Sequence, residues 1–174
     1  MNDGVDRKVI SGIGDFARHT HNYICENIKM ADQKAAFIFA ISSALLVFLF
    51  RKEIHYKWLK PLNAWILSDF IAFLAMMFLA FGIIMAFLVV KPRLTKTHEG
   101  YIFFKSIKSK FSSANDYAAY VYTQNEIDLN NAILKHCYDL SLVCTNKYLS
   151  LLYSVWFSAI GVILSIVLFC LASL

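Results

Sequence analysis

The sequence predicts an all-α membrane protein with three transmembrane helices and a small helical cytoplasmic part. Of its 174 residues, 59% are apolar and only 17% are charged, whereas soluble domains carry about 25% charged residues. The apolar residues are concentrated in three blocks, and a helix that crosses a bilayer needs about 20 of them in succession. No proline or glycine interrupts residues 101–160, which favours long helices between the blocks.

The three blocks define the predicted spans. Transmembrane helix 1 covers residues 31–50 and begins with the charged residues Asp32 and Lys34. It is short unless residues 31–34 enter the membrane interface, with the Lys34 side chain reaching outward to water. Transmembrane helix 2 lies within residues 62–90, and transmembrane helix 3 within residues 149–171. Both are long enough to cross a bilayer.

The distribution of basic residues predicts which side of the membrane each segment occupies. Thirteen Lys and Arg residues lie in the N-terminal segment up to Lys34 and in residues 91–148, against four in the loop 51–61. Cytoplasmic segments carry the excess of Lys and Arg. We therefore expect a multi-pass protein of the bacterial inner membrane, with residues 1–30 and 91–148 in the cytoplasm and loop 51–61 in the periplasm.

Two amphipathic helices are expected to lead directly into spans. A helix over about residues 15–30 would continue into transmembrane helix 1. Upstream of transmembrane helix 3, apolar side chains recur at spacings of mostly four and three, which is the pattern of one helical face. Its members are Leu129, Ile133, Cys137, Leu140, Cys144, Tyr148 and Leu151. The last span should thus be continuous with a long cytoplasmic helix.

The segment after transmembrane helix 2 combines basic and aromatic side chains. Cations suit phosphate and aromatic rings suit bases, so the segment is a candidate site for a nucleotide or a single-stranded nucleic acid. The same cations could instead lie against anionic lipid, and the rings could belong to a helical core. The candidate ligand-binding residues are Lys91, Arg93, Phe103, Phe104, Lys105, Lys108 and Lys110.

Small and hydroxylated residues form one face of transmembrane helix 3: Ser154, Ser158, Gly161 and Ser165. Small residues allow helices to approach closely in a membrane, and hydroxyls can form hydrogen bonds across the contact. The face could pack within one chain, form a seam between subunits or line a pore. Asp69 is the acid within the second block, where a carboxylate is costly. It lies either at the outer interface or at a pore mouth, where a ring of carboxylates would favour cations.

Enzymatic motifs are missing from the sequence. It contains no HExxH, no glycine-rich phosphate loop and no GxSxG. Its His and Cys residues are too sparse for a zinc site, which needs three or four ligands. We expect a protein that is not an enzyme and has no metal or cofactor.

Four short motifs, in order, resemble the Pycsar transmembrane effector family over about residues 20–170. They are "ADQKAAFIFAISSALL" (31–46), "KPR" after the second span, "YIFFKSI" (101–107) and "NNAILKHCYDLSLVCTNKYLSLL" (130–152). The resemblance implies an effector of bacterial anti-phage defence. There, a partner cyclase makes a cyclic pyrimidine nucleotide on infection, the effector disrupts the inner membrane, and the cell stops growing before phage matures. Similar domains occur in Hailong-type systems, where an oligonucleotide from a partner nucleotidyltransferase controls a channel.

The function expected from the spans and the resemblance is a nucleotide-gated homo-oligomeric channel, or another membrane-disrupting effector, in abortive infection. One alternative is an ion channel that an oligonucleotide holds closed. Another is a non-conducting scaffold that recruits a soluble partner to the membrane. We further expect Asp32, Lys34, Lys147 and Tyr148 to form a collar that couples the soluble helices to the spans.

Overall fold

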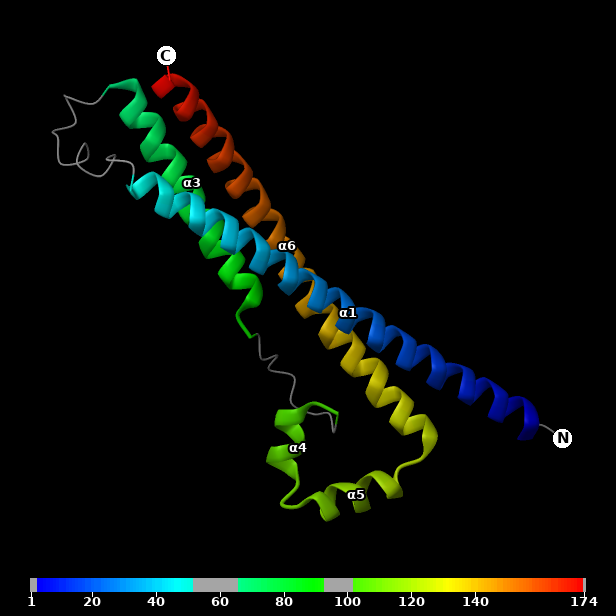
Figure 1. Cartoon of the computed structure of the whole chain (residues 1–174). Helices are drawn as coiled ribbons and strands as arrows, with labels where there is room; N and C mark the ends of the chain where they lie inside the picture. Colours follow the sequence, from blue (N-terminus) through cyan, green and yellow to red (C-terminus); the bar gives the residue numbers. More distant parts are fainter. Residues whose placement is uncertain (1–2, 52–65, 93–101, 174) are drawn as a thin grey trace. The chain divides into compact units, whose positions relative to one another are not determined.

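The computed structural model describes residues 3–51, 66–92 and 102–173. The regular structure of these residues is helical and comprises α1 (Asp3–Leu49), α3 (Leu67–Val90), α4 (Phe104–Lys110), α5 (Ala114–Thr123) and α6 (Glu126–Ser173) (Figure 1). Three helices contain stretches long and apolar enough to cross a membrane: Gly12–Leu49, Leu67–Val90 and Glu126–Leu171. The predictions of an all-helical chain and of three candidate spans are confirmed.

The chain divides into two compact units, and helices α1 and α6 contribute to both. The soluble unit, as we call it, contains residues 1–29 and 93–145, and the spanning unit contains residues 30–92 and 146–174. Each boundary falls within three residues of a predicted span end. The side of the membrane on which the soluble unit lies stays a prediction.

Both long helices are continuous. The predicted amphipathic helix over residues 15–30 is part of α1, which runs without interruption to Leu49. The amphipathic stripe that starts at Leu129 lies within α6, and each of its members is buried or half-buried. The prediction that the last span continues a long amphipathic helix is therefore confirmed.

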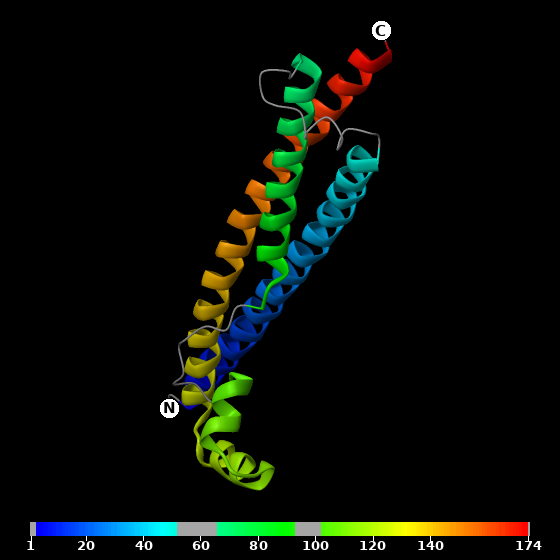
Figure 2. The same cartoon turned by 90° about the vertical axis from the view of Figure 1, so that its left-hand side faces the viewer.

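The spanning unit is a three-helix bundle in which α1, α3 and α6 lie side by side (Figure 2). The ion pair of Asp32 with Lys147 and the bond of Ser42 to Ser158 show that α1 and α6 run parallel. Lys147 contacts Val89 while Ser154 contacts Gly82, so α3 runs antiparallel to α6.

Burial along these helices follows a regular alternation of three and four residues. This spacing is that of left-handed helix packing, in which each seam residue inserts between residues of its neighbours. The buried or half-buried seam positions are 31, 35, 38, 42, 45 and 49 on α1, 72, 75, 79, 82, 86 and 89 on α3, and 147, 151, 154, 158, 161 and 165 on α6.

Small residues occupy much of this seam, and they set how closely the helices approach. A Cβ added at Gly161 would lie 2.8 Å from Leu79 Cγ, and one added at Gly82 would lie 3.1 Å from the Ser158 backbone nitrogen. Neither position has room for a methyl group. Dispersion contacts between backbones replace the hydrophobic driving force that is missing between helices in lipid.

In the soluble unit, α1 and α6 also run parallel, because Gly14 lies against Asn130 and Cys137 Sγ lies 3.7 Å from the Ala17 carbonyl oxygen. The Ser113 hydroxyl caps α5 by accepting from the Asp116 backbone N–H at 3.1 Å, and Asn125 accepts from the Asp128 N–H at 2.7 Å where α6 begins. Such side-chain acceptors satisfy the N–H groups that a helix start leaves without partners. They explain why helices α5 and α6 start at these residues.

Candidate functional site

A buried lysine joins the three helices of the spanning unit. Lys147 of α6 is 5% exposed. Its ammonium forms an ion pair with the Asp32 carboxylate of α1 and donates to the Val89 carbonyl oxygen of α3 at 2.7 Å. We call these three groups the polar joint. Each helix therefore contributes one group, and a single side chain holds them together.

The position of Val89 explains why a main-chain oxygen takes part. α3 ends at Val90, and the last carbonyls of a helix have no N–H partner within it. They also carry the negative end of the helix dipole, which favours a cation. Lys147 thus supplies both a hydrogen bond and a positive charge to the end of α3.

An apolar cluster lies beside the polar joint, where the Lys147 side chain is almost fully buried. Ala31, Ala35, Ala86, Val89 and Leu151 are buried there. The alanines let the three backbones approach closely enough for one lysine to reach both partners. An ammonium in such a place is stable only while its hydrogen bonds and counter-charge are present, because an unpaired buried charge is strongly unfavourable.

The polar joint contains two of the four residues predicted for the collar. Asp32 and Lys147 are in direct contact, and Tyr148 is half-buried against the apolar cluster. Lys34 is exposed on α1 and is not part of the joint. Sequence reasoning missed Val89, because a backbone carbonyl has no residue-type signal. The coupling role of this group stays a prediction.

The hydroxyl face of α6 makes its contacts within the chain. Ser42 donates to the Ser158 hydroxyl at 2.9 Å, and Ser154 donates to the Gly82 carbonyl oxygen at 2.9 Å. Ser165 donates to the Gly161 carbonyl oxygen of its own helix at 2.7 Å. All four predicted members of the face are buried. These contacts are those of helix packing, and a role in lining a pore stays a prediction.

Asp69 lies at the opposite end of α3 from the polar joint. It is buried in the first turn and accepts a hydrogen bond from the Ile66 backbone N–H at 3.3 Å. A carboxylate in this position is favoured by the positive end of the helix dipole. Asp69 thus has a structural role as a helix cap, and its placement at a pore mouth stays a prediction.

The structure places the candidate ligand-binding residues in both units. Lys91 is exposed just after α3 in the spanning unit, whereas Lys108 and Lys110 are exposed on α4 of the soluble unit. Phe103 is half-buried, with its ring 6.4 Å from that of His136. Arg93 and the side chains of Phe104 and Lys105 lie outside the described residues.

A histidine pair lies beside Phe103 in the soluble unit. The rings of His21 and His136 stack with centroids 5.6 Å apart. Burial lowers the pKa of His136, His21 lowers it further, and Asp139 partly opposes the change. In the part of the chain that the structure describes, no three His, Cys, Asp or Glu side chains converge as metal ligands would. The sequence did not indicate this pair, because the two histidines lie 115 positions apart in the chain.

Three long apolar helices joined by buried polar contacts define a multi-pass membrane protein. A family model described as the Pycsar effector protein domain matches residues 16–173, nearly the whole chain. The chain therefore belongs to the Pycsar effector family of anti-phage defence, which confirms the resemblance seen in the sequence. Membership implies the bacterial inner membrane and a cyclic nucleotide signal from a partner cyclase. No curated protein and no solved structure matches the chain.

Proposed function

We propose that this protein is a membrane effector that binds a cyclic pyrimidine nucleotide, oligomerises and permeabilises the inner membrane, so that the infected cell stops growing. The N-terminus and the soluble unit face the cytoplasm, where the nucleotide is made. Family membership supports the signal, and the three spans support the site of action. A pore needs several copies of a chain that has only three spans.

The observation that carries the mechanism is the polar joint. Asp32, Val89 and Lys147 each lie within about three residues of a position where the chain passes from one unit to the other. All three spans are thus held at their soluble-unit ends by one ammonium group. Contacts of this kind have two discrete states, made or broken, and they suit a switch better than a gradual deformation.

In the resting state the polar joint holds the spans in the bundle described above. Nucleotide binding favours a second arrangement only as far as the nucleotide binds that arrangement more tightly. Movement of α1 or α6 in the soluble unit reaches the spans because each is a single helix from Asp3 to Leu49 and from Glu126 to Ser173. In the second arrangement Lys147 loses its partners, and the hydroxyl face becomes available to neighbouring copies.

Leakage from liposomes that contain the purified protein tests the proposal. A trapped dye or ion is followed with cyclic CMP, cyclic UMP or short DNA oligomers outside, and liposomes without protein are the control. Leakage triggered by a cyclic pyrimidine is the expected result. Leakage that occurs without any nucleotide and that a DNA oligomer suppresses would contradict the proposal. It would indicate instead an ion channel that an oligonucleotide holds closed. No leakage under any of these conditions would contradict the proposal and favour a non-conducting scaffold that recruits a soluble partner.

The proposed orientation has its own test. Alkaline phosphatase, active only in the periplasm, is fused after Leu174 or placed before Met1. Activity of the C-terminal fusion alone is the expected result, since three spans put the two ends on opposite sides. Activity of the N-terminal fusion would show that the orientation is the reverse of the one proposed. The soluble unit would then lie in the periplasm, where it could not meet a nucleotide made in the cytoplasm.

A further inference from the structure

A groove between α1 and α6 combines an apolar floor with a cation. Its volume is about 390 Å³, and it lies in the spanning unit. Phe37 and Ile38 of α1 and Leu151 and Val155 of α6 form the apolar part, and Gln33 and Lys34 lie at one end. One end of the groove is therefore polar and the rest is apolar.

Lys34 marks the point at which α1 becomes apolar. No charged residue follows it until Arg51, so its ammonium lies at the polar end of the span. The side chain is exposed, and among the described residues no carboxylate forms an ion pair with it. The nearest acid along the helix, Asp32, is held by Lys147. Lys34 thus presents a positive charge at the rim of an apolar groove.

We propose that this groove binds one anionic phospholipid. An acyl chain lies against Phe37, Ile38, Leu151 and Val155, and the headgroup phosphate accepts hydrogen bonds from the Lys34 ammonium and the Gln33 amide. A lysine near a membrane surface contributes about 1 kcal/mol to attraction by anionic lipid.

The charges of the spanning unit favour a lipid over a second copy of the chain. A protein partner would have to bring a carboxylate to Lys34. The described residues of the spanning unit contain only Asp32 and Asp69. The first is paired with Lys147, and the second is buried at the far end of α3. The phosphate of a lipid headgroup is therefore the complementary anion.

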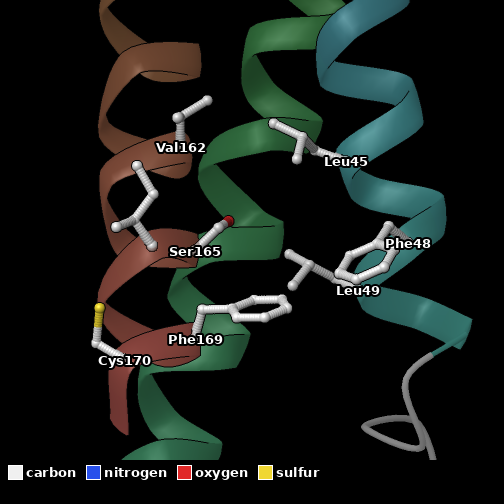
Figure 3. Close-up of a pocket in the computed structure, with 8 residues that line it drawn as sticks. Leu45, Phe48, Leu49, Val162, Ser165, Phe169 and Cys170 are labelled. Atoms are coloured by element: carbon white, nitrogen blue, oxygen red, sulfur yellow. The ribbon is translucent and has the colours of Figure 1, made fainter. Parts of the chain in front are cut away.

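A second groove between the same two helices provides a comparison. It has a volume of about 240 Å³ and is lined by Leu45, Phe48, Leu49, Val162, Ser165, Ile166, Phe169 and Cys170 (Figure 3). It contains no charged side chain. An acyl chain can cover it, but nothing there distinguishes one headgroup from another. Headgroup selectivity should therefore arise at Lys34.

Native mass spectrometry of the full chain in neutral detergent tests the proposal. Palmitoyl-oleoyl phosphatidylglycerol is titrated against phosphatidylcholine with the same chains, and glycerol phosphate tests whether the headgroup alone suffices. Lys34→Gln should weaken phosphatidylglycerol binding about fivefold and phosphatidylcholine binding less, because the choline cation offsets the charge of its phosphate. Lys34→Arg should restore the affinity. Lys135→Gln, which removes an equal charge from an exposed position of α6 in the soluble unit, is the matched control and should have a smaller effect.

A substitution that fills the groove distinguishes a lipid bound in the groove from a general attraction of the protein to anionic lipids. Val155→Phe should remove the preference for phosphatidylglycerol, and Lys34→Gln added to it should cause no further loss. Equal affinities of wild type and Lys34→Gln would overturn the proposal. So would binding of glycerol phosphate as tight as that of the lipid. If the protein formed a dimer in the presence of phosphatidylcholine and Lys34→Gln dissociated it, the groove would bind a second copy of the chain instead of a lipid.

Discussion

The polar joint makes a prediction about the free energy of unfolding of the bundle. Asp32→Asn removes the counter-charge of Lys147 but keeps a hydrogen-bond acceptor of the same shape. Lys147→Met removes the cation and fills its space with an apolar side chain of similar length. The two substitutions therefore act on one contact from opposite sides, and the double variant completes a thermodynamic cycle.

The magnitudes follow from the unequal exposure of the two side chains. The Lys147 side chain is 6% exposed and the Asp32 side chain 36% exposed. Removing one partner of a fully buried pair costs about 3–5 kcal/mol, and partial exposure of Asp32 reduces this to about 2–3 kcal/mol for Asp32→Asn. Lys147→Met leaves a carboxylate that water reaches and should cost about 1–2 kcal/mol. In the double variant the two costs overlap, which gives a coupling energy of about 2 kcal/mol.

The assay is unfolding of purified protein in mixed micelles with a denaturing detergent, followed by circular dichroism for wild type, both single variants and the double variant. Lys135→Met, at an exposed position of α6 in the soluble unit, is the matched control and should change the free energy by less than about 0.5 kcal/mol. Additive costs of the two single substitutions, with a coupling energy below about 0.5 kcal/mol, would refute the reasoning.

The remaining predictions concern helix packing and pH. Gly161→Ala should destabilise the bundle by about 1–3 kcal/mol, because its Cβ would lie 2.8 Å from Leu79 Cγ and 3.0 Å from the Leu79 backbone nitrogen. Gly12→Ala, with no atom within 4 Å, is the matched control and should be neutral or stabilising in the same assay; equal losses would contradict the packing. Burial, and then His21, hold the pKa of His136 in the folded protein below the ordinary value of 6.5. The contribution of His136 to the free energy of unfolding is therefore present above pH 6.5. It is lost as the pH falls through the pKa of the folded protein. Stability measured from about pH 8 to about pH 5 should fall less steeply in His136→Gln than in wild type, and identical slopes would contradict the assignment.

The spans were predictable because they depend on composition and period alone. Residues 62–90 contain an apolar block of the required length, and α3 occupies Leu67–Val90 within it. The stripe that includes Leu129, Cys137 and Leu151 repeats at helical spacing, so continuity of the last span with its upstream helix was also predictable. These features are local in the sequence, and each can be recognised without knowing which residues pack against it in the folded protein.

The partners within the site were harder to predict because they are remote along the chain. Asp32 and Lys147 were both expected in the collar, but nothing in the sequence indicated that Val89 supplies the third group. The stack of His21 on His136 has no sequence signal either, because it depends on the parallel register of α1 and α6. Register is fixed by the packing of small residues such as Gly82 against Ser158, which composition does not reveal.

In the proposed mechanism, the polar joint keeps the membrane closed until the nucleotide arrives. The most direct test is leakage from liposomes as a function of cyclic pyrimidine concentration, with wild type, Lys147→Met and the Lys135→Met control at equal protein density. The loss of about 1–2 kcal/mol expected for Lys147→Met shifts the resting-to-open ratio by roughly 5- to 30-fold. Lys147→Met should therefore leak at a lower nucleotide concentration than wild type and the control. A nucleotide threshold for Lys147→Met equal to that of wild type would contradict the account.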